Sequence, residues 1–370
     1  MAKRPDLLII GGGLVGCAAA YELAQAGLAV TVVERGTPGC EASSAGAGML
    51  SPQSVTSAPN PMLSLGLASQ ALYADLAAGL RERTGVDVEH QTGGSLHCFV
   101  DEGEAAVGRA AFSWQQEAGL KADLLSREEA LALEPGLSPE ILGALYLPGD
   151  QWVNNPRLVT ALAHAAALEQ VDFVRAEVSA LLRRGDRVLG VSANGSEISA
   201  GGVLLAAGAW SGHLAAAVGL TLPVQPVRGQ ILCLEAIPRR LHHLLHVKDH
   251  YLVPRASGEI LVGSSLEWVG FVKQVTAAQI HAFLHSAIRL VPSLARLPLK
   301  ASWAGLRPWA PDERPVMGPW PGIEGLYVAT AHFRNGILLA PITARLVKEL
   351  IVDGKPSFDL TPFLPNRFLK

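Results

Sequence analysis

The chain has 370 residues, 49% of them hydrophobic and 17% charged, with a formal net charge of −3. This composition predicts compact lobes rather than disorder, and the charge balance gives no general attraction for nucleic acid or for an anionic membrane. Apolar runs are far shorter than a bilayer requires, so we expect a cytoplasmic protein without a membrane partner. Four scattered cysteines, Cys17, Cys40, Cys98 and Cys233, predict reduced thiols and no metal site.

The N-terminal segment carries the most informative motif. The apolar run 7–10 predicts a strand, residues 11–16 read Gly-Gly-Gly-Leu-Val-Gly, and a helix over 17–25 leads to a second strand over 28–33 that ends at Glu34. Gly11 permits a tight turn, Gly13 lets the backbone approach a pyrophosphate, and Gly16 lets the helix pack on the strand. Glu34 is placed to accept hydrogen bonds from ribose hydroxyls. The segment therefore predicts a dinucleotide site.

A secretory signal is the alternative reading of the same segment. Lys3-Arg4 precedes an apolar run that ends at Cys17, as in a lipid-attachment signal. Three consecutive glycines would weaken such a signal helix, and polar residues up to Gln25 continue the helix toward the strand that ends at Glu34. We favour the nucleotide site.

The next part of the chain alternates turn-rich segments with regular elements. Residues 36–61 are rich in Gly, Ser, Ala and Pro, which predicts a loop wrapped around a ligand. We expect helices over residues 63–83, 113–119, 127–133 and 156–168, and strands over residues 92–100, 171–178, 188–191 and 197–200. Four histidines, His242, His243, His246 and His250, lack a carboxylate pattern and predict a partly exposed helix or loop face rather than a metal site.

The apolar strand 202–207 ends in small residues and should return to the sheet that contains residues 7–10. We therefore expect a discontinuous nucleotide-binding lobe made of residues 1–53, 150–213 and 327–370. The second lobe, residues 54–149 and 214–326, should bind the substrate. Its expected strands are 230–234, 251–254, 259–263 and 301–303, with a helix over 277–290. The fold class is α/β, with a Rossmann-like lobe beside an antiparallel-rich mixed sheet.

Six motifs together resemble the D-amino acid oxidase superfamily of FAD-dependent oxidoreductases, and within it the glycine oxidase branch. The motifs are residues 11–16 with Glu34, 43–50, 206–211, 251–255, 303–308 and 332–341. The resemblance implies FAD rather than NAD, with the flavin ring between the lobes. No cysteine lies in the C-terminal tail, so the FAD should be noncovalent.

The resemblance also implies which residues contact FAD. These are Gly11, Gly13, Leu14, Val15, Gly16, Glu34, Arg35, Ser43, Ser44, Ala47, Gly48, Met49, Val178, Ala207, Gly208, Trp210, His332, Phe333, Arg334, Asn335, Gly336, Ile337 and Leu338. The physical reading agrees at two segments. Residues 46–48 offer backbone with almost no side chain beside a flat ring, although an ordinary flexible loop is the alternative. Backbone amides at 334–336, at the start of a helix, can stabilise an anionic reduced flavin.

Amine oxidation needs an anchor for the substrate carboxylate more than a strong acid or base, because the flavin takes the hydride. A guanidinium binds both carboxylate oxygens at once. The resemblance assigns this role to Arg307, with an ion pair to Asp312 or Glu313 as the structural alternative. Tyr251 would add a hydroxyl hydrogen bond to the same carboxylate, although a half-buried strand tyrosine is the plainer reading.

Further pocket residues follow from the same resemblance. The backbone carbonyl of Arg334 would orient the substrate amine, while Leu266 and Ser51 stand where some glycine oxidases have a methionine and a glycine. Residues 52–61 are expected to form a lid that limits the amine substituent. Three aromatic residues, Trp268, Phe271 and Trp309, would line the entrance unless they are simply core residues.

The expected reaction is FAD-dependent oxidation of glycine and related small amines: sarcosine, small D-amino acids and N-substituted glycines. The products are an imine, then a 2-oxo acid with ammonia or an amine, and hydrogen peroxide from molecular oxygen. The resemblance further implies a homotetramer and a role of the glycine imine in thiamine thiazole synthesis. Two alternatives stay open: a D-amino acid dehydrogenase that reduces a quinone or carrier, and a non-catalytic flavin-binding subunit of a larger complex.

Overall fold

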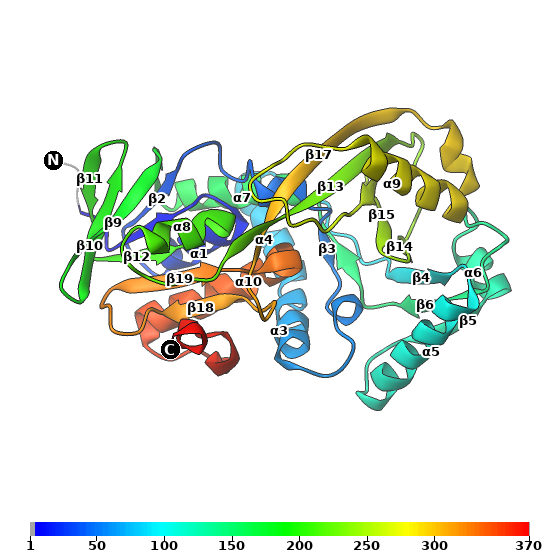
Figure 1. The fold of residues 1–370 in the computed structure, drawn as a ribbon, viewed down its shortest axis with the longest axis horizontal. Coiled ribbons are helices and arrows are strands. Elements are labelled where there is room, and N and C mark those ends of the chain that lie inside the picture. Colours follow the sequence, from blue (N-terminus) through cyan, green and yellow to red (C-terminus); the bar gives the residue numbers. More distant parts are fainter. Residues whose placement is uncertain (1–3, 370) are drawn as a thin grey trace.

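The computed structural model describes residues 4–369, which form two lobes side by side (Figure 1). The first lobe contains a six-stranded sheet, in which β19 to β8 are parallel and β18 is antiparallel. Its strands in spatial order are β18 (Val316–Pro319), β19 (Leu326–Thr330), β12 (Gly202–Leu205), β1 (Leu7–Ile10), β2 (Val30–Glu34) and β8 (Asp172–Arg175).

Alternating side chains cover both faces of this sheet. Leu7 and Ile9 belong to the core that the sheet shares with α1 (Leu14–Gln25), α7 (Asn155–Leu168) and α10 (Gly336–Lys348). Leu8 and Ile10 face the opposite core, formed with the smaller sheet β9 (Val178–Arg184), β10 (Arg187–Ala193) and β11 (Ser196–Ser199) and with α8 (Ser211–Ala216). Both faces of a parallel sheet must be covered, which explains the unbroken apolar sequence of β1.

The predicted return of the chain to the first strand is confirmed, because β12 pairs with β1 from Leu7↔Gly202 to Ile10↔Leu205. The C-terminal tail adds β19 beside β12. One strand differs from the expected division: β18, at 316–319, belongs to this sheet although residues 214–326 were assigned to the second lobe. The detailed domain boundaries stay a proposal.

The second lobe is built on an eight-stranded sheet that is antiparallel except between β14 and β4. Its strands in spatial order are β17 (Leu299–Trp309), β13 (Gln225–Glu235), β16 (Glu259–Gly263), β15 (His250–Pro254), β14 (Leu244–Val247), β4 (Ser95–Phe99), β6 (Gly143–Leu147) and β5 (Asp123–Ser126). Helix α9 (Ala277–Leu290) packs on one face through Phe283, and α5 (Glu102–Glu117) and α6 (Arg127–Leu133) flank the far end. On the opposite face, Ala47 and Trp152 pack against apolar side chains of the sheet. The α/β class and the mixed, antiparallel-rich second sheet are confirmed.

The single helix predicted over 63–83 is wrong. The chain forms α3 (Pro61–Gln70) and α4 (Tyr73–Thr84), with a break at residues 71–72. Flanking the break, the Ser69 hydroxyl donates to Leu338 O at 2.6 Å and the Tyr73 hydroxyl donates to Ile337 O, so both side chains hold the start of α10. The short elements α2 (Ala42–Ala45), β3 (Met49–Leu50) and β7 (Gln151–Trp152) connect the lobes.

The histidine cluster was also placed wrongly. His246 and His250 lie on the neighbouring strands β14 and β15, not on a helix, and His243 is buried against Glu134. The imidazole of His246 stacks on His97 of β4 with 4.1 Å between ring centroids. Residues 4–369 contain no group of three or more metal-ligating side chains.

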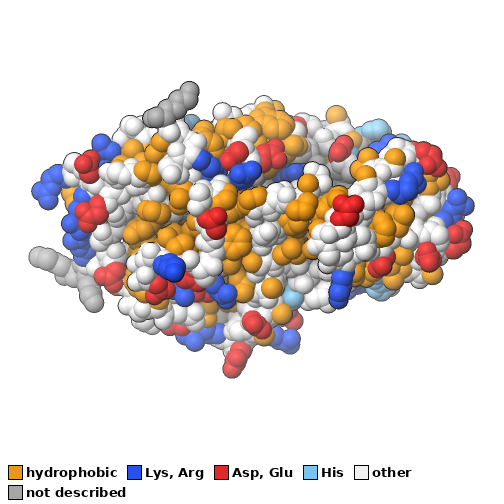
Figure 2. Space-filling view, turned by 90° about the horizontal axis from the view of Figure 1, so that it is seen from below, with side chains coloured by type: hydrophobic (Ala, Val, Ile, Leu, Met, Phe, Trp, Pro, Cys, Tyr) orange, Lys and Arg blue, Asp and Glu red, His pale blue; other side chains and the backbone are white. Residues whose placement is uncertain are grey.

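Two further findings concern the lipid-attachment signal and the membrane-spanning segments considered from the sequence. Cys17, the residue on which the lipid-attachment reading depends, is buried inside α1, with its thiol near Gly12 O. Within residues 4–369, no helix has the length and apolar content to span a membrane. Seen from below, apolar side chains gather across the centre of the molecule and charged ones toward both ends (Figure 2).

Phe283→Ala tests the packing of α9 on the second sheet. Phe283 is fully buried, so truncation removes its apolar contacts and leaves a cavity that costs about 3 to 5 kcal/mol. We expect a clear fall in the urea midpoint of this lobe, followed by circular dichroism. Val107→Ala on the exposed face of α5 is the control, and equal midpoints for the two variants would contradict the packing described here.

Candidate active site

A cavity of about 360 Å³ runs along the junction of the two lobes. On the first lobe it is lined by the β1–α1 turn, the ends of β2 and β12, and the start of α10. On the second lobe it is lined by β13 and β17. The ligand-facing ends of parallel strands meet an antiparallel sheet here, which is the usual position for a ligand in an α/β fold.

The β1–α1 turn forms a cradle for a diphosphate. Gly11 has φ +105°, and a Cβ at this position would lie 2.6 Å from Ala206 O. The Glu34 carboxylate accepts from Gly12 N at 2.7 Å and from Gly36 N at 2.8 Å, which fixes it at the end of β2 with further lone pairs free for ribose hydroxyls. No acidic residue occupies the first turn of α1, so its positive end faces the cavity. These residues fit a dinucleotide.

The segment before α10 closes the cavity at its other end. Ala331 and Phe333 adopt left-handed backbone conformations, with φ of 59° and 50°, on either side of His332. Such backbone strain in non-glycine residues is typical of a ligand clamp. His332 is buried, lies 3.0 Å from Thr343 Oγ1, and burial lowers its pKa to about 4, so the ring is neutral. Helix α10 begins at Gly336, which directs its amide groups toward the cavity.

Arg307 enters the cavity from β17. Its guanidinium donates to Ser264 Oγ at 2.7 Å and to Ser265 O at 3.0 Å. Gly229, on the neighbouring strand β13, makes room for it, because any Cβ there would collide with the guanidinium. Burial lowers the pKa of Arg307, and the positive charge of Arg334 lowers it further. A guanidinium nevertheless stays protonated, so the cavity holds a poorly solvated cation.

The ion pair proposed as the alternative role of Arg307 is absent. Asp312 pairs instead with Arg367 at 2.7 Å, and the ion pairs among residues 4–369 include none with Arg307. The Tyr251 hydroxyl interacts with the guanidinium and raises its pKa. Tyr251 fits beside Gly263, where a Cβ would lie 3.0 Å from the phenolic oxygen. The two predicted carboxylate-binding side chains therefore lie together, and their role stays a prediction.

Many of the other predicted residues line the cavity. They are Gly11, Gly13, Leu14, Val15, Glu34, Arg35, Ser43, Val178, Ala207, Gly208, Trp210, His332, Phe333, Arg334, Gly336 and Ile337. Other predicted residues are not part of this lining: Gly16, Ser44, Ala47, Gly48, Met49, Asn335 and Leu338, with Ser51, Tyr251 and Leu266 of the substrate set. Gly16 still acts on the cradle, because its missing side chain lets α1 approach Gly11 O.

The first residues of the expected lid lie outside the cavity lining and are held in place by hydrogen bonds. Gln53 donates to Gln115 at 2.6 Å, and the Ser54 hydroxyl lies 2.7 Å from Asp150 Oδ2 and 3.0 Å from His97 Nε2. Ser51 is buried beside the same carboxylate, and residues 57–60 are exposed. Only this exposed stretch resembles a lid.

Asp150 is a buried carboxyl group outside the cavity lining that sequence reasoning missed. It is fully buried, and its Oδ2 also accepts from Ser95 at 2.6 Å. Burial raises its pKa to about 6, and the hydroxyls of Ser95, Ser54 and Ser51 partly offset this effect. Neighbouring His97 and His246 are neutral, since burial lowers the pKa of each. No local motif marks Asp150, because its partners come from two distant segments, residues 51–54 and β4.

The three aromatic residues expected at the entrance have different surroundings. Trp268 is 55% exposed and contacts Trp309 edge to face at 6.3 Å. Phe271 packs against Trp210 of the first lobe at 5.4 Å. Leu266 is exposed and lies outside the cavity lining. Leu266, Trp268 and Phe271 thus belong to an exposed loop, whereas Trp309 is a half-buried residue at the end of β17.

Comparison with known proteins agrees with this geometry. The family model described as FAD dependent oxidoreductase (DAO) matches residues 6–350. Glycine oxidase from Pseudomonas aeruginosa is 39% identical and covers 99% of both chains. The crystal structure of glycine oxidase from Geobacillus kaustophilus superposes with a TM-score of 0.95 at 37% identity, covering 99% of this chain and 100% of that one. Hydrogen cyanide synthase subunit HcnC from P. aeruginosa is 33% identical and covers 100% of this chain and 97% of its own.

The cavity is therefore that of an FAD-dependent oxidoreductase. The chain belongs to the DAO family of these enzymes, and the resemblance to its glycine oxidase branch is confirmed. When bound, FAD supplies the redox chemistry, and the residues that would hold it and the substrate are the β1–α1 turn, the segment around His332 and the partly buried cation of Arg307.

Gly11→Ala tests the cradle. The added methyl group would meet Ala206 O while the backbone holds a left-handed conformation, so we expect FAD affinity to fall about ten- to a hundredfold. The measurement is the dissociation constant of FAD, from flavin absorbance after ultrafiltration. Gly79→Ala, in a helix and with open space around its Cβ, is the control. Unchanged affinity in Gly11→Ala would refute the assignment.

Asp150→Asn tests the buried carboxyl group through the pH dependence of unfolding. The pKa of Asp150 is about 6 in the folded protein and near 3.8 when unfolded, so the folded state holds more protons between these values and wild-type stability falls as pH rises through this window. His97, whose pKa burial lowers to about 4, makes the wild-type protein more stable as pH rises through an overlapping range. Both proteins contain His97, so the difference in stability between Asp150→Asn and wild type isolates the effect of Asp150.

We expect the unfolding free energy of Asp150→Asn, relative to wild type, to rise by on the order of 2 kcal/mol between pH 4 and pH 6 and then to level off. Urea unfolding at a series of pH values measures it, with exposed Asp353→Asn as the control. A pH-independent difference would show that Asp150 titrates normally.

Proposed function

We propose that this enzyme is an amino acid oxidase that converts glycine and small related amines to imines. The observation that supports this most is the cation of Arg307, which lines the cavity near Tyr251 and has no carboxylate partner among residues 4–369. A substrate carboxylate would supply the missing charge. Bound FAD would accept a hydride from the substrate carbon, and oxygen would take the electrons to give hydrogen peroxide.

The chain itself holds and orients the substrate. The two terminal nitrogens of Arg307 would bind both carboxylate oxygens, and the Tyr251 hydroxyl would add a third hydrogen bond. The backbone carbonyl of Arg334 would accept from the substrate amine, which turns its carbon toward the cofactor. Neutral His332 adds no charge there, so positioning rather than acid-base catalysis is the main contribution.

The candidate substrates are glycine, sarcosine, small D-amino acids and N-substituted glycines, with 2-oxo acid and ammonia or amine as final products. In a thiamine-making cell the glycine imine would supply thiazole synthesis. Four free cysteines suit the cytoplasm, where they would stay reduced, and we propose a homotetramer by likeness to the family.

Two other functions compete with this one. A D-amino acid dehydrogenase would use the same site but pass electrons to a quinone or carrier instead of oxygen. A subunit role is favoured by the likeness to hydrogen cyanide synthase subunit HcnC. The unpaired Arg307 argues against a purely non-catalytic subunit, because a flavin scaffold needs no carboxylate-binding cation.

One experiment separates these functions. The purified holoprotein is mixed with glycine in air, and flavin absorbance and peroxide are followed together. Catalytic peroxide production supports the oxidase. Flavin bleaching without peroxide, relieved by an artificial quinone, indicates the dehydrogenase. Neither signal with glycine, sarcosine or D-alanine would contradict catalysis by this chain alone.

Arg307→Ala should raise KM for glycine about 30- to 1000-fold while FAD stays bound, because a charged, bidentate contact worth about 2 to 4 kcal/mol is lost. Arg307→Lys keeps the charge but not the planar fork, so an intermediate KM is expected. Steady-state kinetics and flavin absorbance are the measurements. Arg81→Ala, at an exposed ion pair, is the control. Loss of FAD without a KM effect would reassign Arg307 to cofactor binding.

A further inference from the structure

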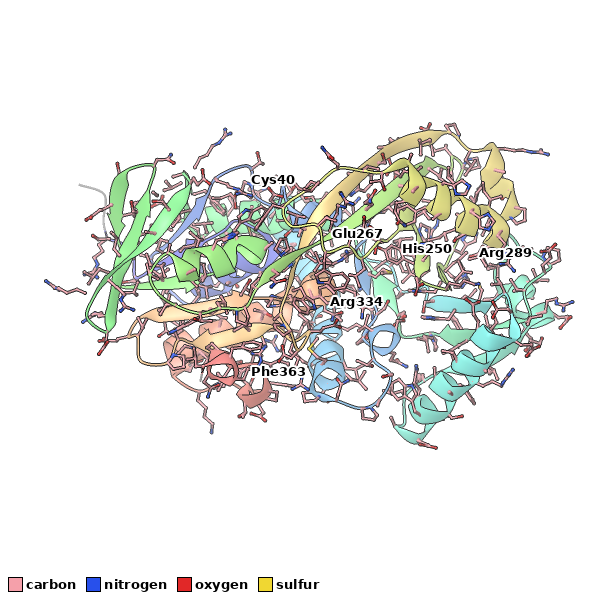
Figure 3. All side chains as sticks on the ribbon, viewed as in Figure 1. Cys40, His250, Glu267, Arg289, Arg334 and Phe363 are labelled. Carbon is pink, nitrogen blue, oxygen red and sulfur yellow. The ribbon has the colours of Figure 1, made fainter. Side chains whose placement is uncertain are left out.

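Residues 266–275 form a loop between β16 and α9 that we call the crossing loop. Both of its ends are tied to β13. Near the first end, Glu267 forms an ion pair with Arg228 and accepts from Gln230 Nε2 at 2.7 Å. At the second end, Arg228 donates to Gln274 O at 2.9 Å and Thr276 N donates to Gln230 Oε1 at 2.8 Å. Glu267 lies near the boundary of the lobes (Figure 3).

The middle of the crossing loop leaves its own lobe and touches the other. The Phe271 ring lies 5.4 Å from Trp210 and 5.0 Å from His213, measured between ring centroids. Lys273 Nζ lies 2.9 Å from Glu41 Oε2. In Figure 1 the loop, drawn in olive, reaches from the β17 side toward α8.

All three partners of the loop line the cofactor cavity: Trp210, His213 and Glu41. Arg35 joins them, with Nη2 2.9 Å from Glu41 Oε1 and its guanidinium carbon 3.9 Å from the centre of the Trp210 ring. Arg35 directly follows Glu34, which is placed to bind the ribose. The loop therefore meets the cavity at the end where the adenosine half of a dinucleotide would lie.

We propose that the crossing loop retains the cofactor, with Phe271 and Lys273 completing the wall around the adenosine half of FAD. The inference goes beyond the proposed function, because it holds whichever amine is oxidised. It also explains why apolar side chains project from this loop: Trp268, Val269, Phe271 and Val272 are 37 to 55% exposed. Phe271 supports the aromatic face of Trp210, while Lys273 fixes Glu41 and through it Arg35.

The two contacts should differ in strength. An aromatic pair packs apolar surface and is little affected by salt. The Lys273–Glu41 pair has side chains 45% and 27% exposed, so solvent and salt screen it. Phe271 should therefore account for most of the retention, and Lys273 for a smaller, salt-dependent part.

The test measures the rate at which the holoprotein releases FAD, from flavin fluorescence after dilution. We expect Phe271→Ala to release FAD about five- to tenfold faster than wild type. Lys273→Gln should release it about twofold faster at low salt and at the wild-type rate at high salt. Val272→Ala, an exposed apolar neighbour in the same loop, is the matched control and should stay within about twofold of wild type.

Two further measurements keep the test decisive. Thermal unfolding of all variants in excess FAD should give equal midpoints, so that faster release reflects the contact rather than the fold. The proposal would be overturned if Phe271→Ala released FAD at the same rate as the control Val272→Ala. It would also be overturned if Phe271→Ala lowered the mass in light scattering without changing release, because the loop would then be a contact between copies of this chain.

Discussion

The site depends on one electrostatic constraint, the desolvated cation of Arg307. A guanidinium partly removed from water needs an anion or several hydrogen bonds, and within the described residues 4–369 its partners are the neutral oxygens of Ser264 and Ser265 together with the Tyr251 hydroxyl. The remaining charge is available to a ligand. Under the proposed function, the carboxylate anchor would be in place before any amine binds, which would reduce the cost of ordering the site.

The antiparallel sheet holds this cation through cross-strand pairing. Val227 of β13 faces Arg307 of β17, and Gly229, one step along the same face, leaves space for the guanidinium. Gly263 leaves space for Tyr251 in the same way across β16 and β15. The loop that begins at Ser264 continues as the crossing loop. The segment that follows Gly263 therefore contributes to both proposals, because it holds the Arg307 guanidinium through Ser264 and Ser265 and continues as the loop proposed to retain the cofactor.

Local features of the sequence were enough to predict the nucleotide cradle. The glycines of residues 11–16, the acid Glu34 and the strand order act within one β-α-β unit, and each has a direct conformational reason. Helices 127–133 and 277–290 were predicted to the residue because amphipathic periodicity and capping are local signals as well.

Features that depend on distant partners could not be predicted in this way. The break between α3 and α4 is set by contacts to Leu338 O and Ile337 O, more than 260 positions away in the chain. Asp150 and Gly229 acquire their roles only when strands pair, and the histidines of β14 and β15 had no periodic pattern to reveal them. Phe271 was noticed as an aromatic residue, but its contact with Trp210 needed the tertiary structure.

The most direct test is a crystal structure of the FAD-loaded protein with glycolate, a carboxylate that lacks the amine and is not oxidised as one. The account predicts glycolate with both carboxylate oxygens on the Arg307 guanidinium and one on the Tyr251 hydroxyl, facing a flavin ring held near residues 332–338. Glycolate bound to another cation, or a flavin diphosphate away from the β1–α1 turn, would contradict it.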